Sequence, residues 1–187
     1  MPPKLKVTRD GIINTALMLC RTGGESAINA RGIAKALNCS TQPIFSNFES
    51  MEELDEAVRD SAYELYLEFL ENEARTMKYP RYKAFGMAYI RFAKEEKELF
   101  KLLFMCDRNE KTATRTSDFQ ESVQMIMKNN GIEKEAAERI HLETWVFTHG
   151  IATMLATSFL ELDQSLISDM LTDVYQSITA KYKSEDK

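Results

Sequence analysis

The spacing of apolar residues constrains the fold most, because they recur every three or four positions along nearly the whole chain. This spacing gathers apolar side chains on one face of an α-helix, whereas a half-buried strand would alternate with a period of two. No segment sustains such alternation. The pattern predicts an all-α protein of about nine helices and no sheet, with these approximate ranges: 8–21, 29–37, 40–47, 50–79, 80–92, 99–105, 117–130, 133–160 and 165–183.

Charge is distributed unevenly over the 187 residues, which carry a net charge of -5. Residues 1–50 hold six basic and three acidic side chains, so this part has a charge of +3 and the remainder has -8. A chain of this length has room for one sizeable core or for a small domain packed on a larger one. We expect two domains, a three-helix domain at 1–50 and a larger helical domain at 51–187.

Residues 30–48 predict two short helices around a three-residue turn, which is the helix-turn-helix geometry. Asn29 is a good N-cap for the first helix, and Ser40 is expected to cap the second, with Pro43 in its first turn. Five apolar residues can lock the two helices together: Ile33, Ala34, Leu37, Ile44 and Phe48.

The polar face of the second helix would then point outward. Thr41, Gln42, Ser46 and Asn47 become available to a DNA major groove, where Gln or Asn can bond an adenine edge and Thr can meet a thymine methyl group. An ordinary helical hairpin is the alternative interpretation. The basic charge of this domain favours DNA, because Lys4, Lys6 and Arg9 form an N-terminal arm that could follow the phosphates.

The segment from Ile33 to Leu54, Ile-Ala-Lys-Ala-Leu-Asn-Cys-Ser-Thr-Gln-Pro-Ile-Phe-Ser-Asn-Phe-Glu-Ser-Met-Glu-Glu-Leu, resembles the N-terminal signature of the TetR (tetracycline-repressor) family, and the resemblance covers roughly residues 8–58. Residues 143–152, Glu-Thr-Trp-Val-Phe-Thr-His-Gly-Ile-Ala, resemble the family's Trp...His-Gly element. Two residues differ from the family pattern: Phe45 replaces the usual Tyr, and Met51 replaces the usual Lys.

The resemblance implies a homodimer that binds double-stranded DNA at a palindromic operator, with a ligand in the C-terminal domain changing the separation of the two recognition helices. It implies a ligand-responsive transcriptional regulator, which we expect to repress transcription. By position, Asn29 and Arg31 would reach phosphate, and Phe45 would face DNA. The expected DNA-binding residues are Lys4, Lys6, Asn29, Arg31, Ser40, Thr41, Gln42, Phe45, Ser46 and Asn47.

Aromatic and methionine residues are frequent between residues 79 and 154, and they suit an adaptable pocket for a small apolar or amphipathic ligand. Plain core packing is the alternative for each of them. The expected pocket residues are Phe85, Tyr89, Phe92, Phe104, Met105, Phe119, Met125, Trp145 and His149.

The last two predicted helices each carry an apolar stripe. Two such helices from each subunit would form a four-helix bundle across a two-fold axis, which is where the family places its dimer interface. Packing within one chain is the alternative. The expected interface residues are Thr144, Phe147, Ile151, Leu155, Met170, Val174 and Ile178.

Several other classes of protein find no support in the sequence. It has no Gly-rich phosphate loop and no nucleophile elbow, and neither of its two His has a candidate catalytic partner, so we expect no enzyme. The three Cys are far apart and no His pair has zinc-ligand spacing, so neither a metal nor a cofactor is expected. The absence of a signal peptide and of a membrane-spanning stretch predicts a cytoplasmic protein. The main rival is an interaction protein that keeps the helix-turn-helix fold but no longer binds DNA.

Overall fold

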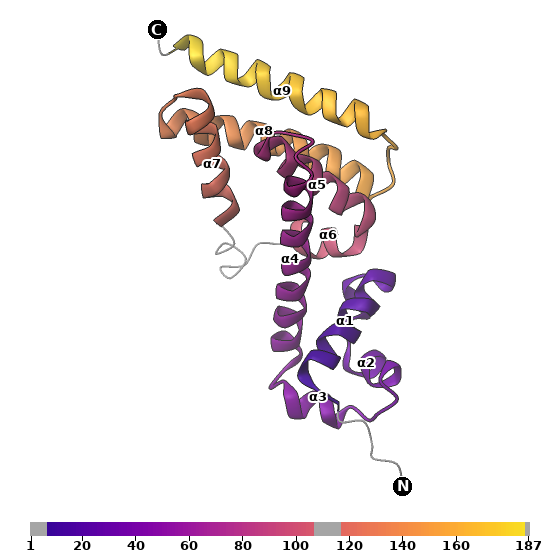
Figure 1. Ribbon diagram of the computed structural model, residues 1–187. Coiled ribbons are helices and arrows are strands. Elements are labelled where there is room, and N and C mark those ends of the chain that lie inside the picture. The colour runs from indigo at the N-terminus through magenta and orange to yellow at the C-terminus, as the bar shows by residue number, and fades with distance from the viewer. Residues whose placement is uncertain (1–6, 107–116, 186–187) are drawn as a thin grey trace. The chain divides into compact units, whose positions relative to one another are not determined.

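A computed structural model describes residues 7–106 and 117–185, and these residues form nine α-helices, one short 3₁₀-helix and no strand (Figure 1). The all-α prediction is confirmed, as is the expected number of helices. The elements are α1 (Arg9–Gly23), η1 (Glu25–Ala27), α2 (Ala30–Ala36), α3 (Gln42–Asn47), α4 (Met51–Arg75), α5 (Arg81–Glu95), α6 (Lys97–Phe104), α7 (Ser117–Asn130), α8 (Lys134–Ala156) and α9 (Gln164–Glu185).

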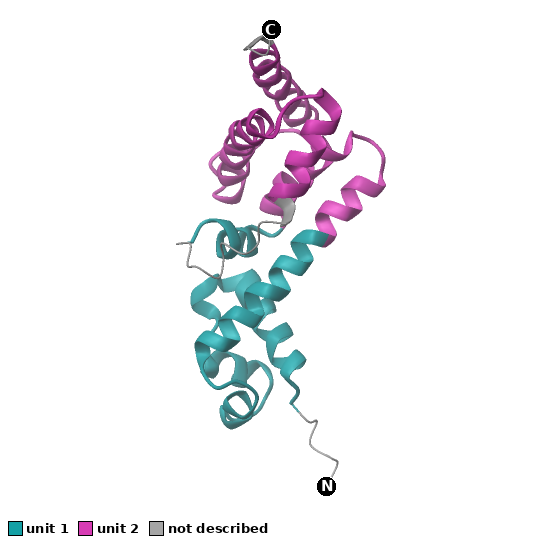
Figure 2. Cartoon of the chain, turned by 90° about the vertical axis from the view of Figure 1, so that its left-hand side faces the viewer, with its two compact units in different colours: residues 1–67, 96–106 teal, residues 68–95, 107–187 magenta. Residues whose placement is uncertain are grey.

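The chain packs as two compact units (Figure 2). Unit 1 holds the residues up to 67 together with 96–106, and unit 2 holds 68–95 and 107–187. The division therefore falls inside α4 and again between α5 and α6. These packing units do not coincide with the ranges 1–50 and 51–187, which stay a prediction about function, because the first part of α4 and all of α6 belong to the same unit as α1, α2 and α3.

Unit 1 is organised around α1, which packs against α2, α3 and α6. Ile12, Ala16 and Cys20 line the buried face of α1. The helix ends where Gly24 adopts a φ of +71°, in the left-handed region that favours glycine. A Cβ at this position would also lie 2.9 Å from Oε2 of Glu98, a flexible side-chain end that can move, so the positive φ is the main reason for glycine here.

Local capping signals place most helix starts in unit 1. The Asn29 side chain accepts a hydrogen bond from the Gly32 N–H at 2.8 Å, which confirms Asn29 as the N-cap of α2. The Ser50 hydroxyl likewise accepts from the Glu53 N–H at 3.2 Å. The expected cap at Ser40 is wrong, because α3 begins one residue later, with Thr41 at its N-cap and no side-chain capping bond.

Unit 2 is organised around α8, which packs against α5, α7 and α9. The middle of α5 is buried on almost every side, and its Gly86 faces Leu171 of α9, where a Cβ would make ordinary van der Waals contact at 3.4 Å. α8 ends at Ala156, whereas the sequence pattern predicted that this helix would continue to about Leu160. A buried cluster joins α7, α8 and α9: Val123, Ile126, Ile132, Ala137, Ile140 and Tyr182.

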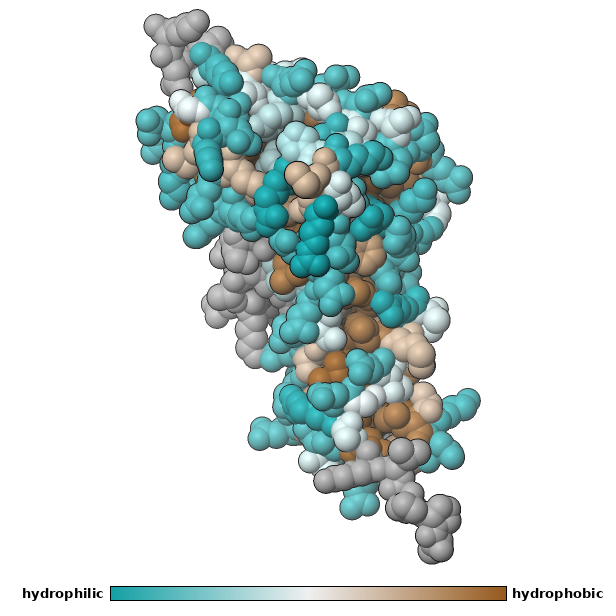
Figure 3. Space-filling model, in the orientation of Figure 1, coloured by the Kyte–Doolittle hydropathy of each residue, from teal (hydrophilic) through white to brown (hydrophobic). Residues whose placement is uncertain are grey.

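On the face seen in Figure 3, most of the surface is hydrophilic, but hydrophobic side chains reach it in several places. No helix in the described ranges is both long and apolar enough to cross a lipid bilayer. Among the described residues, the exposed large apolar side chains are Met18, Phe45, Met77, Met105, Phe119, Leu142, Val146, Met154, Phe159, Leu160 and Leu166.

Candidate nucleic-acid interface

The turn between α2 and α3 is fixed by backbone hydrogen bonds and by a buried apolar face. The Cys39 N–H donates to the Ala34 carbonyl at 2.9 Å, and Asn38 turns the chain with a φ of +50°, a conformation that Asn tolerates. Ile33 and Ile44 are fully buried. With Ile44 held inside, α3 has one orientation, and the opposite face of the helix points to solvent.

The outward face of α3 consists of Gln42, Phe45 and Ser46, which are all exposed and share one side of a helix by their spacing of three and four. The Phe45 side chain is 52% exposed, unusually for an aromatic residue. The Ser46 hydroxyl donates to the Gln42 carbonyl at 2.9 Å. Thr41 is half-buried at the start of this face, and Ser40 before it is exposed.

Asn47 lies beside this face and is held by bonds within the domain, and its expected role in reading bases stays a prediction. Its side-chain amide donates to the Pro43 carbonyl at 2.7 Å, and its backbone carbonyl accepts from the Arg9 guanidinium at 2.6 Å. The side chain is half-buried. These bonds hold the C-terminal end of α3, so Asn47 positions the helix.

Arg9 is also part of the scaffold, which corrects its assignment to an arm that follows phosphates. Its guanidinium pairs with the Glu53 carboxylate at 2.8 Å and lies over the Phe48 ring, 4.0 Å from the centroid. The Glu49 N–H, which also donates to Glu53, and the nearby Arg9 charge lower the pKa of the Glu53 carboxyl. Arg9 therefore ties α1 to the end of α3 and the start of α4. Lys4 and Lys6 lie outside the described residues.

At the start of α2, Arg31 is exposed, and so is Lys35 one turn later. Asn29 is engaged in the turn itself, because its amide nitrogen lies 3.3 Å from the carbonyl oxygens of Ser26 and Ala27. The first turn of α2 contains no acidic residue, and α3 contains no charged residue at all. A polyanion that approached these helices would meet positive or neutral side chains.

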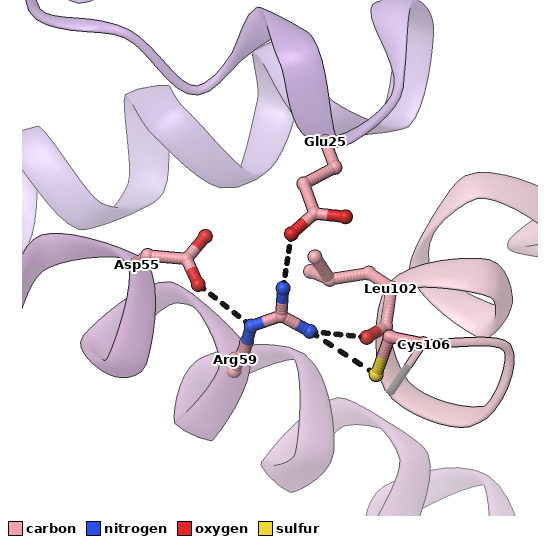
Figure 4. Close-up of polar contacts among 5 residues, drawn as sticks. All are labelled: Glu25, Asp55, Arg59, Leu102 and Cys106. Carbon is pink, nitrogen blue, oxygen red and sulfur yellow. Dashed lines mark hydrogen bonds and ion pairs between the residues drawn. The ribbon is translucent and has the colours of Figure 1, made fainter. Parts of the chain in front are cut away.

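Sequence reasoning missed the charged cluster around Arg59, which holds three elements of unit 1 together (Figure 4). The Arg59 guanidinium pairs with Asp55 on the same helix at 2.7 Å and with Glu25 of η1. It also donates to the Leu102 carbonyl of α6 at 2.5 Å and contacts the Cys106 sulfur at 3.6 Å. The only local signal was the spacing of four between Asp55 and Arg59.

A second arginine secures α6 from its other end. Arg21 of α1 makes two hydrogen bonds of 2.8 Å to the Glu96 carboxylate, which directly precedes α6. Beneath these contacts, burial raises the pKa of the Cys20 thiol to about 11, so this thiol stays protonated at neutral pH. Unit 1 therefore combines an apolar interior with arginine pairs at its rim.

The expected pocket residues are divided between the two units. Phe104 and Met105 belong to unit 1, where the Phe104 ring packs edge-on against Tyr66 at 5.1 Å and Met105 is exposed. The other seven lie in unit 2. Phe85, Tyr89 and Phe92 are buried on α5, Met125 is half-buried on α7, and Phe119, at the start of α7, is exposed.

Two tyrosine–histidine pairs link α5 to α8 in unit 2. The Tyr89 hydroxyl lies 2.8 Å from Nδ1 of His149, and Trp145 stacks on the same imidazole at 5.3 Å. The second pair was missed in the sequence: the Tyr82 hydroxyl lies 3.0 Å from Nδ1 of His141. Burial lowers the pKa of His141 to about 4, so its ring is neutral at pH 7.

The expected dimer residues divide into two groups. Thr144, Ile151 and Leu155 are buried within the chain itself, with 4–6% of each residue exposed, so they have almost no surface left for a partner. We therefore withdraw these three. Phe147, Met170, Val174 and Ile178 are half-buried. The apolar side chains that do face outward on α8 and α9 are Leu142, Val146, Met154 and Leu166, and the linker between the two helices adds Phe159 and Leu160.

Within the described ranges, no three His, Cys, Asp or Glu residues are grouped as a metal site requires. The family model for the tetracyclin repressor-like C-terminal domain matches residues 82–175. This span covers half of the chain and includes both tyrosine–histidine pairs, all of α8 and about the first half of α9. No curated protein sequence matches the chain.

Proposed function

The chain belongs to the TetR family, and on that premise we propose that it is a ligand-responsive transcriptional regulator that binds a palindromic operator as a homodimer, with repression as its effect. The family domain implies a regulatory rather than a catalytic protein. DNA would be bound by the α2–α3 pair of each subunit. The domains proposed for the two tasks are residues 1–50 for DNA and 51–187 for the ligand and the partner subunit.

The observation that carries the proposal is the outward face of α3. Gln42, Phe45 and Ser46 are exposed on a short helix whose opposite side is anchored by the buried Ile44. A recognition helix must combine these two properties, because it has to enter a groove without losing its position on the domain. The surrounding residues 1–50 have a net charge of +3, which favours a phosphate backbone as the partner.

Phosphate contacts are proposed for Arg31 and Lys35 of α2, because both are exposed and no acidic side chain lies in the first turn of that helix. Asn29 keeps the start of α2 in place and can also lie against the backbone of the DNA. Lys4 and Lys6 remain proposed as a basic arm on the strength of the sequence.

The homodimer is proposed to form through α8 and α9. The proposed contact surface consists of the exposed apolar residues of these helices instead of the buried ones. Val146 is 57% exposed, and Leu142 and Met154 lie near it along α8. Leu166 and the half-buried Met170 and Val174 extend the apolar surface onto α9. Apolar side chains spaced along two neighbouring helices are typical of a helical dimer interface.

The ligand is proposed to be a small apolar or amphipathic molecule that binds among the aromatic residues of unit 2. Tyr89, Trp145 and His149 form a group in which a hydroxyl and an imidazole lie among large apolar surfaces. Such a group can orient a ligand by one or two hydrogen bonds while the surrounding rings supply contact area. Phe104 and Met105 are no longer included, because they belong to unit 1.

The rival interpretation is an interaction protein that has kept this fold without binding DNA. Two sequence features favour it: the apolar Phe45 and Met51 stand where the family usually has Tyr and Lys, and the whole chain has a charge of -5. A protein partner would use the same exposed face of α3.

Selection from a library of random DNA duplexes separates the two interpretations. We expect the protein to enrich one palindromic sequence, and Gln42→Ala to relax that sequence at one symmetric position. Lys128→Ala changes an exposed residue of unit 2 and should leave the enriched sequence unchanged. If no duplex is enriched even at low salt, where phosphate contacts are strongest, the interaction protein is the better interpretation.

A further inference from the structure

The outward face of α3 leaves few side chains that can reach a base pair. Of its exposed members, Ser46 donates its hydroxyl hydrogen to the Gln42 carbonyl at 2.9 Å. Asn47, the other amide of the helix, donates to the Pro43 carbonyl at 2.7 Å and is half-buried. The side chains best placed to extend from this face are the Gln42 amide and the Phe45 ring.

The Phe45 ring limits what this face can recognise, because it has neither a hydrogen-bond donor nor an acceptor. Against a phosphate or against a polar base edge, the ring would displace water from groups that it cannot bond, which is unfavourable. The major groove of DNA offers one apolar group, the C5-methyl group of thymine. Contact with that methyl group is the arrangement in which burial of the exposed ring is favourable.

Gln42 lies three positions before Phe45, which corresponds to a rise of about 4.5 Å along the helix. Base pairs are stacked about 3.4 Å apart, so the two side chains are suitably spaced for neighbouring base pairs. The Gln side-chain amide can bond adenine bidentately through N6 and N7. The two contacts together favour adjacent A·T pairs.

We propose that Phe45 determines specificity by reading the methyl group of a thymine in each operator half-site, beside an adenine that is bound by Gln42. This inference rests on the proposed function. The proposed occupant of the α3 face is duplex DNA, because the neighbouring α2 exposes Arg31 and Lys35 and neither helix contains an acidic residue.

Deoxyuridine tests the proposal, because it pairs like thymidine but lacks the methyl group. In the duplex obtained by selection, each symmetric pair of thymidines is replaced by deoxyuridine, one pair at a time, and affinity is measured by fluorescence anisotropy. Replacement of one particular pair should weaken binding about fifteenfold, because two methyl groups are lost and each contributes about fourfold to the affinity. The other replacements should leave the affinity unchanged.

Variants assign the effect to the ring. Phe45→Ala should bind the thymidine and deoxyuridine duplexes with nearly equal affinity at the sensitive position, because the contact is already absent. Gln42→Ala should keep the fifteenfold difference there while tolerating other bases at the neighbouring pair. Both positions are exposed, so both variants should fold, which circular dichroism verifies.

The possible failures are distinguishable. If a palindrome is selected and bound but every deoxyuridine replacement is neutral, the role of Phe45 is refuted and the proposed function stands. The same holds if Phe45→Ala keeps the full difference. If no duplex is enriched, both the proposed function and this inference are refuted.

Discussion

Unit 1 and unit 2 align neighbouring helices with partly different chemistry. Both contain arginine–carboxylate pairs between elements, with Arg81 and Arg91 in this role in unit 2, but unit 2 adds two tyrosine–histidine pairs. In unit 1, Arg9, Arg21 and Arg59 each pair with a carboxylate from another element of the fold. In unit 2, α5 and α8 are linked by the uncharged pairs of Tyr82 with His141 and of Tyr89 with His149. Arginine keeps its charge at any ordinary pH, whereas the buried imidazole of His141 responds to acid.

The difference shows how each unit can serve its proposed task. In unit 1, Arg9 bonds to the end of α3, and Arg21 and Arg59 hold the two ends of α6. These bonds keep the recognition face in one orientation. In unit 2, hydroxyl and imidazole groups lie among aromatic rings, where a small molecule could exchange hydrogen bonds with them. The following predictions test this contrast, starting with the largest expected effect.

Acid should destabilise unit 2 through His141. The pKa of this residue falls from its ordinary value of 6.5 to about 4 on folding because the ring is buried. Between these two values the unfolded chain binds more protons than the folded chain, so stability decreases as the pH falls from 6.5 to 4, by about 3 kcal/mol in total. Urea unfolding at several pH values measures this loss.

Two variants show whether His141 is the source. His141→Gln should remove most of the loss between pH 6.5 and 4, because the titrating ring is gone. Tyr82→Phe should keep the loss, since burial and not the tyrosine hydroxyl lowers the pKa of the imidazole. If His141→Gln loses as much stability in acid as the unmodified protein, the assignment of acid sensitivity to unit 2 is wrong.

Replacement of Arg59 should destabilise unit 1 more than replacement of Arg21. The Arg59 side chain is only 15% exposed and bonds to Asp55 and the Leu102 carbonyl, whereas the Arg21 side chain is 40% exposed. Arg59→Met should cost about 2 kcal/mol, because it leaves partly buried acceptors without a donor. Arg21→Met should cost at most about 1 kcal/mol. Equal costs in chemical denaturation would contradict a structural role for the Arg59 cluster.

Helix caps should contribute similar amounts of stability in the two units, so this feature should not distinguish them. The Thr8 side chain caps α1 by accepting from the Gly11 N–H at 3.1 Å, and the Asp163 carboxylate caps α9 by accepting from the Leu166 N–H at 2.9 Å. Thr8→Ala and Asp163→Ala should each cost about 1 kcal/mol in thermal or urea unfolding. A cost near zero for one of them alone would mean that its helix end is held by other contacts.

The features that could be predicted from the sequence depend on neighbours along the chain. The periodic apolar residues predicted the helices, and Asn29 marked the start of α2 correctly, because a cap involves residues within about four positions. The exposed face of α3 was also expected, since Ile44 fixes which side of so short a helix is buried.

The features that could not be predicted depend on distant parts of the chain. Arg9 looked like a phosphate contact, and only the fold brings it to Asn47 and Glu53. Thr144, Ile151 and Leu155 have the spacing of an interface, but the same spacing serves the interior, and nothing local shows which face of α8 meets α5. Likewise, the meeting of Tyr82 with His141 across 59 positions leaves no sequence pattern.

A hydroxyl-radical footprint on the selected duplex tests the central claim most directly, that α3 of each subunit enters a major groove. The account predicts two protected segments related by symmetry and centred about 10 base pairs apart, or a whole multiple of that spacing, on the same side of the helix. Loss of both segments in a variant carrying Gln42→Ala and Phe45→Ala would assign them to α3. A single protected segment, or protection that this variant leaves unchanged, would contradict the account.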